Sequence, residues 1–123
     1  MSSTTNTERR VAGDSVKPEH PASLSLEVVE GKERLYLQGC ISVNNVGDYR
    51  DQIISIFTGK PDLEELDLSR TELNGSSVVA LLISIQRFIQ TENRHLVIVQ
   101  PQPKLLEMAA MNGLRDILPF EQI

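Results

Sequence analysis

The sequence predicts an α/β fold: a mixed β-sheet of about four to five strands with helices packed on it. The main observation is the order of patterns between residues 23 and 120, where strand-like alternation and helix-like spacing succeed one another as β-β-α-β-α-β-α. The second is length, because 123 residues suit one domain with its own core. The third is composition, since 40% hydrophobic and 24% charged residues are ordinary for a globular domain.

The first 22 residues differ from the rest of the chain. They are rich in Ser, Thr and Asn, carry charges of both signs, and include Pro18 and Pro21. Such a segment buries too little apolar surface to offset the entropy of ordering, so we predict a disordered tail over 1–22 and a domain over 23–123. The tail lacks the apolar stretch of a secretory signal and Cys40 is the only cysteine, so a cytoplasmic setting is expected.

A β-hairpin is expected at the start of the domain. In SLSLEVV (23–29) leucine and valine alternate with polar residues, as in a strand with one buried face. The triplet EGK (30–32) supplies a turn, and RLYLQG (34–39) resumes the extended pattern. We expect Leu35 and Leu37 of this second strand to face the core.

The next segment, NNVGDYRDQIISIF (44–57), predicts a helix. Asn44 or Asn45 is expected to cap it and Gly59 to end it. Its apolar residues recur at helical spacing, and they are Val46, Tyr49, Ile53 and Phe57.

Two further strands and two further helices complete the pattern. LEELDLS (63–69) predicts a third strand, and the unbroken apolar run of HLVIV (95–99) predicts a fourth strand buried on both faces. A helix is expected from Pro103 to Gly113, and RDILPF (115–120) is a candidate for a short last strand. Functional positions in such sheets favour the loops beyond the carboxyl ends of strands, which directs attention to the loop that follows the third strand.

The helix after that loop begins near Ser76 or Ser77, at the border of the most apolar segment of the chain. A serine there can cap the helix, and a phosphate on it would also suit the unpaired amides and positive dipole end of a helix start. Val79 and Ile83 lie beside the broad apolar face of this helix. They are either covered by another helix or part of a docking surface next to the serines. The residues expected to face the sheet are Val78, Leu81, Leu82, Ile85, Phe88 and Ile89.

Several stretches of the chain resemble the STAS domain, the fold of bacterial anti-sigma factor antagonists. They are LEELDLSRTELNGSSVVALLISIQRF, HLVIV, KLLEMAAMNGLRDILPF and LYLQGCISVNNVGDYRDQI. Asp67-Leu68-Ser69 matches the Asp-x-Ser that ends the third strand in this family. The family then has Asp-Ser-x-Gly at the start of the helix, and Ser76 falls on its phosphorylated serine. Gly75 stands in place of the aspartate and Val78 in place of the glycine.

The resemblance implies a non-enzymatic binding module that switches partners. In such systems the unphosphorylated protein binds an anti-sigma factor or a related serine kinase of the GHKL type. That kinase phosphorylates the serine, and a PPM-type phosphatase removes the phosphate. Carried over, this makes Ser76 the expected phosphorylation site, with Ser77 as second choice. The expected contact surface comprises Asn74, Gly75, Ser76, Ser77, Val79 and Ile83.

A second class with the same domain is the cytoplasmic STAS subunit of phospholipid-transport ABC systems, which binds the ATPase. The few residues after Phe120 and the altered switch motif favour this alternative. The paired serines favour the regulator, because the transporter subunits carry Thr and then Gly-Gly in that loop.

Other classes of function have little support in the sequence. The net charge of -5 with no basic stripe argues against nucleic-acid binding, and the longest apolar run is too short to cross a bilayer. A nucleophilic Ser76 or Ser77 would need a nearby base, and the only candidates are His20 and His95, so no enzyme is predicted. One cysteine and two histidines give no metal-ligand spacing, no cofactor is predicted, and specific nucleotide binding is a weak third option.

Overall fold

The structure, a computed structural model, describes residues 20–122. They form a four-stranded sheet in the order β1-β2-β3-β4 and three helices, which confirms the predicted fold class. The elements in chain order are β1 (Ser23–Val29), β2 (Lys32–Cys40), α1 (Val46–Gly59), β3 (Glu65–Glu72), α2 (Ser77–Thr91), β4 (Val97–Val99) and α3 (Pro103–Met111).

The hairpin at the start of the sheet forms as predicted. β1 and β2 are antiparallel, and Val29 pairs with Lys32 across a two-residue turn. Both turn residues have a positive φ, 51° at Glu30 and 83° at Gly31, as a type I′ turn requires. This turn matches the right-handed twist of the two strands, and it fixes which face of β1 joins the core.

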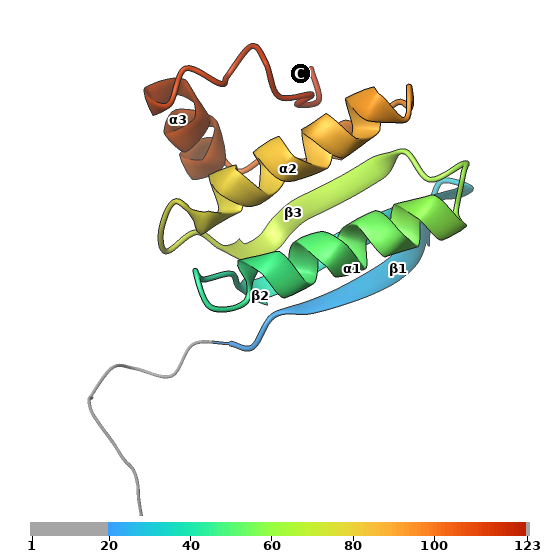
Figure 1. The fold of residues 1–123 in the computed structure, drawn as a ribbon, viewed down its shortest axis with the longest axis horizontal. Helices are drawn as coiled ribbons and strands as arrows, with labels where there is room; N and C mark the ends of the chain where they lie inside the picture. Colours follow the sequence, from blue (N-terminus) through green and yellow to red (C-terminus); the bar gives the residue numbers. More distant parts are fainter. Residues whose placement is uncertain (1–19, 123) are drawn as a thin grey trace, which may run out of the picture.

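The core lies between the sheet and the helices. β2, β3 and β4 are mutually parallel, and Figure 1 shows α1 and α2 side by side on one face of the sheet. Leu35 and Leu37 are fully buried on that face, as predicted. The helices add residues at the predicted spacing, among them Ile53, Phe57, Val78, Leu81, Leu82, Ile85 and Ile89.

The third strand differs from the prediction at both ends. It begins at Glu65 and runs to Glu72, three residues beyond Ser69. A register shift at Tyr36 and Gln38 of β2 allows the polar residues of 70–72 to pair with 38–40. The loop before α2 is therefore shorter than predicted and covers 73–76.

The last part of the chain also departs from the prediction in detail. β4 is only three residues long, and the proposed final strand is reduced to one parallel bridge between Ile98 and Phe120. Main-chain bonds of Ile98 with Pro119 and Glu121 place this C-terminal segment along the outer edge of β4. The third helix begins at Pro103 and is followed by Gly113 with φ 70°, both as predicted.

Of the predicted tail, residues 1–19 lie outside the described residues. Residues 20–22 contact the domain: the His20 carbonyl accepts from Cys40 N at 3.0 Å, and the Ala22 carbonyl accepts from Tyr49 Oη at 2.6 Å. Within residues 20–122, no helix has the length and apolar character needed to cross a membrane.

Candidate functional site

The predicted site residues lie where the parallel strands end. The loops 41–45, 73–76 and 100–102 follow β2, β3 and β4, and we call these three loops the carboxyl edge. Figure 1 shows the loop before α1 and the loop before α2 at the same end of the sheet. In open α/β sheets this end commonly carries the binding site, so the topology agrees with the place that the sequence indicates.

Side-chain bonds join two of these loops through the end of β2. Asn74 Nδ2 donates to Cys40 Sγ at 3.6 Å, and Asn45 Nδ2 donates to the Cys40 carbonyl at 3.1 Å. Asn45 Oδ1 accepts from Ser42 N at 2.8 Å. Asn45 is the N-cap residue of α1, one of the two predicted, but its side chain makes no capping bond and holds the preceding loop instead. Asn74 thereby connects the serine loop to the rest of the carboxyl edge.

Ser76 is exposed at the N-cap position of α2. Its φ of -83° and ψ of -2° are already helical, and its side chain makes no capping bond. Capping through the hydroxyl, one of the two roles considered for these serines, is therefore not seen at Ser76, because a helical backbone at the N-cap does not present the hydroxyl to the following amides. Ser77 is the first helical residue and is half-buried. The Ser76 hydroxyl is open to other molecules.

The expected docking role of the apolar flank needs correction. Val79 is buried, with 4% of its surface exposed, so the expectation that it contributes to an exposed docking surface is wrong. The buried face of α2 is wider than the face that helical spacing predicts to pack on the sheet. Val79 lies within this wider buried face. Ile83, one turn later, is half-buried and keeps some surface for contact.

A different apolar side chain is exposed at the carboxyl edge. Val43, in the loop before α1, has 82% of its surface exposed. Sequence analysis missed it, although a lone branched apolar residue inside the polar run SVNN was a signal. Together with the exposed residues Asn74, Gly75 and Ser76, it gives this edge both polar and apolar contact groups.

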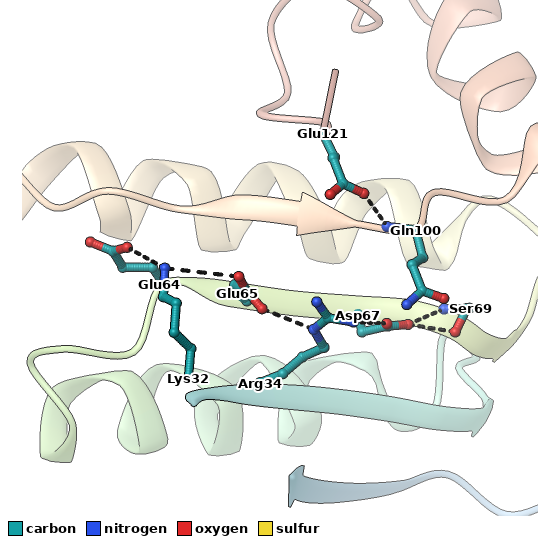
Figure 2. A network of polar contacts seen from close by, with 8 residues as sticks. All are labelled: Lys32, Arg34, Glu64, Glu65, Asp67, Ser69, Gln100 and Glu121. Carbon is teal, nitrogen blue, oxygen red and sulfur yellow. Dashed lines mark hydrogen bonds and ion pairs between the residues drawn. The ribbon is translucent and has the colours of Figure 1, made fainter. Parts of the chain in front are cut away.

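The face of the sheet opposite the core carries a polar network along the first part of β3 (Figure 2). Asp67 is fully buried, and its Oδ1 accepts from Ser69 N at 2.7 Å and from Ser69 Oγ at 2.6 Å. Its Oδ2 forms an ion pair with Arg34 Nη1 at 3.5 Å. Arg34 Nε donates to Glu65 Oε1 at 2.9 Å. These bonds fix the strand that leads into the serine loop.

The charge of Arg34 is held in place by this network. Partial burial by itself lowers the pKa of the guanidinium, but hydrogen bonds and attraction to Glu65 and Tyr36 outweigh that effect and raise the pKa. The guanidinium therefore stays charged beside Asp67 at any working pH. The network is therefore a structural support for β3, because removal of Arg34 would leave the buried Asp67 side chain without its charged partner.

Within residues 20–122, neither histidine makes a hydrogen bond with Ser76 or Ser77. The ring Nδ1 of His20 contacts Glu72 Oε2, at the end of β3, and His95 is exposed just before β4. Cys40, at the end of β2, is buried. Over residues 20–122, no three His, Cys, Asp or Glu side chains gather closely enough to hold a metal ion.

Comparisons with known proteins place this geometry in a wider group. Residues 24–122 match the family model described as the STAS domain. The fold is similar to an anti-sigma factor antagonist from Mycobacterium paratuberculosis, with a TM-score of 0.63 and 18% identity over 84% of this chain and 87% of that one. It is also similar to the unphosphorylated anti-sigma factor antagonist SpoIIAA, with a TM-score of 0.58 and 17% identity over 81% of this chain and 89% of that one. A search of curated proteins finds no match.

Proposed function

The chain belongs to the STAS domain family, and we propose that it is a non-enzymatic regulatory binding module of a bacterial partner-switching system, of the anti-sigma factor antagonist type. In this proposal the carboxyl edge binds a protein partner, and phosphorylation of Ser76 controls that binding. The two structural neighbours described above are anti-sigma factor antagonists, which supports the general role.

One observation carries the proposal: an exposed hydroxyl stands at the start of a 15-residue helix without capping it. α2 has no acidic residue in its first turn, so its positive dipole end is not already neutralised by a side chain of that turn. A phosphate on Ser76 would be attracted by this end and by the amides of the first turn. The modification would then leave the helix folded and change only the surface.

The proposed contact surface consists of Val43, Asn74, Gly75, Ser76 and, at its margins, Ser77 and Ile83. A phosphate would add about -1.5 to -2 charges in the middle of it. That charge would repel a partner surface that is itself electronegative, and it would cost desolvation energy where an apolar partner surface covers the exposed Val43. The proposed partners are an anti-sigma factor or serine kinase of the GHKL type, with a PPM-type phosphatase to reverse the modification.

The alternative is the ATPase-binding subunit of a phospholipid-transport ABC system. It is favoured by the altered motif around Ser76. Gly75 is exposed and an added Cβ there would meet no atom within 4 Å, so the aspartate of the switch motif would fit but is absent. Val78, in place of the motif glycine, is fully buried and belongs to the core. In this alternative the same edge binds the ATPase and Ser76 is not modified.

The test combines affinity capture of the tagged full chain from its native cell with phosphosite mapping. We expect an anti-sigma factor or kinase among the captured proteins and phosphate on Ser76. With the captured partner in hand, Ser76→Asp should weaken binding by roughly tenfold or more, measured by isothermal titration calorimetry, because it places negative charge at the centre of the contact surface.

The matched controls separate charge from loss of the hydroxyl. Ser76→Ala should bind as the native chain does, and Ser76→Asp should leave the thermal midpoint almost unchanged, because aspartate is favourable at a helix start. Recovery of a transporter ATPase alone, with Ser76 never phosphorylated, would move the assignment to the alternative.

A further inference from the structure

We propose that the outer edge of β1 pairs with the same edge of a second copy of this chain, which gives a symmetric dimer with a continuous eight-stranded sheet. The proposal concerns a surface on the opposite side of the sheet from β4 and is independent of the proposed partner-switching function. It rests on the contrast between the two edges of the sheet and on the self-complementary order of residues in β1.

In the described part of the chain, one edge of the sheet is covered by another segment, and the other edge is not. Along β4, Ile98 N donates to Pro119 O at 2.8 Å and Glu121 N donates to Ile98 O at 2.9 Å, so the C-terminal segment covers that edge. Among residues 20–122, β1 pairs with β2 only, and its outer edge runs for the seven residues Ser23–Val29. An edge of that length with unpaired main-chain groups is a template for another strand.

β1 also lacks the features that usually keep an edge strand from pairing. It contains no lysine and no proline, and its one charged residue is Glu27. The Glu27 carboxylate is already matched within the chain, because its Oε2 accepts from Arg70 Nη1 at 2.7 Å. Two copies of this edge can therefore approach each other without bringing together unpaired like charges.

The main-chain groups that face outward belong to the apolar residues. Val29 and Lys32 flank the two-residue turn and so form a hydrogen-bonded pair, and such pairs alternate along an antiparallel hairpin. Glu27 and Ser25 consequently direct their N–H and C=O groups toward β2. Leu24, Leu26 and Val28 direct theirs outward, and three residues of one copy can exchange six hydrogen bonds with the same three of another.

The side chains of β1 are complementary to themselves under two-fold symmetry. With the axis at Leu26, this residue pairs with its own copy and Leu24 pairs with Val28 of the second copy. Leu26 and Val28 are 38% and 70% exposed, so the pairing would cover the apolar surface that β1 leaves open. On the other face, Ser25 would lie opposite Glu27 of the second copy. The Ser25 hydroxyl is buried and has no hydrogen-bond partner in the described chain, and that carboxylate would supply an acceptor.

The decisive experiment uses the residue on the axis. Sedimentation of the full native chain over a wide range of concentrations should show a monomer–dimer equilibrium. Leu26→Lys should weaken dimerisation by more than about tenfold, because it removes an apolar pair and sets two like charges opposite each other. Leu26→Glu should do the same. A mixture of the two variants should recover dimers that contain one copy of each, since only a self-paired position responds in this way.

The matched control is Val43→Lys, which places the same charge on an exposed apolar residue in the loop after β2, outside the proposed β1 pairing, and should leave dimerisation unchanged. Circular dichroism of each variant checks that it is folded. A native chain that stays monomeric at every concentration would overturn the proposal and would leave the edge to a strand of a different protein. A dimer that persists in Leu26→Lys, or variants that do not recover each other, would overturn it as well.

Discussion

Gly39 shows how one residue sets the entry of the chain into the domain. It lies in β2 with φ 85°, and a Cβ there would stand 2.2 Å from the Pro21 carbonyl oxygen and 2.9 Å from Ala22 Cα. This close approach allows the Cys40 amide to bond the His20 carbonyl at 3.0 Å. No side chain other than hydrogen meets both the steric and the conformational requirement.

We therefore expect Gly39→Ala to destabilise the domain by about 2 to 4 kcal/mol, the sum of an unfavourable positive φ and an overpacked contact. Urea unfolding followed by circular dichroism measures this change. Gly75→Ala is the matched control: its Cβ would meet nothing within 4 Å and its φ is not in the left-handed region, so its effect should stay under about 1 kcal/mol. Equal effects of the two substitutions would contradict the role assigned to Gly39.

At the candidate site, the burial and contacts of individual residues could be predicted from the sequence only in part. The exposure of Ser76 follows from its place at a loop–helix border, and the sequence predicted it. The burial of Val79 depends on how wide a face the rest of the domain covers, which helical spacing does not determine. The support of Asp67 by Arg34, 33 positions earlier in the chain, depends on strand register and has no local signal.

At the scale of elements, Arg94 joins the end of α2 to the end of α1. Its guanidinium donates to three main-chain carbonyls: those of Phe57, of Lys60 at 2.8 Å and of Leu63 at 3.3 Å. The Phe57 carbonyl lies in the last turn of α1, and Lys60 and Leu63 lie in the segment that follows the helix, so this side chain holds the end of α1 and the segment after it together. Its planar group also lies 5.5 Å from the centre of the Phe57 ring.

Arg94→Ala should cost about 2 to 3 kcal/mol of stability, because charge-assisted bonds to partly buried carbonyls are lost. Hydrogen exchange should quicken most in the last turn of α1, and this local readout distinguishes a lost helix cap from general destabilisation. Arg94→Lys should recover less than half of the lost stability. The lysine ammonium lacks the planar fork of donors with which the guanidinium reaches three carbonyls. Arg87→Ala, on the exposed side of α2, should change stability by less than about 0.5 kcal/mol.

The elements themselves follow largely from local patterns. The hairpin turn, the three helices and the stop at Gly113 require only residues close in sequence, and all were predicted. The end of β3 was not. Arg70 and Glu72 are polar and give no alternation, and they are strand residues because a register shift in β2 offers them partners. The end of β3 is therefore set by pairing with a distant segment, and local propensity does not predict it.

At the scale of the whole molecule, the proposed dimer and the carboxyl edge occupy different sides of the sheet. Pairing of two antiparallel β1 strands implies a two-fold axis perpendicular to the sheet, so both copies would keep their helices on the same face. β2, β3 and β4 of one copy would run opposite to those of the other. The two carboxyl edges, each with its Ser76, would therefore point to opposite ends of the dimer, and each could bind a partner without obstructing the other.

Because the two surfaces are separate, dimerisation through β1 and partner binding at the carboxyl edge should not affect each other. Ser76→Asp should leave the dimerisation constant within about twofold of the native value, because the added charge lies beyond the end of β3 and β2 intervenes before β1. Leu26→Lys should in turn leave the affinity for the captured partner unchanged per monomer. Sedimentation and calorimetry on the two single variants and the double variant measure both effects. If Ser76→Asp shifts the dimer equilibrium strongly, the interface must include the carboxyl edge, and pairing through β1 alone is then insufficient.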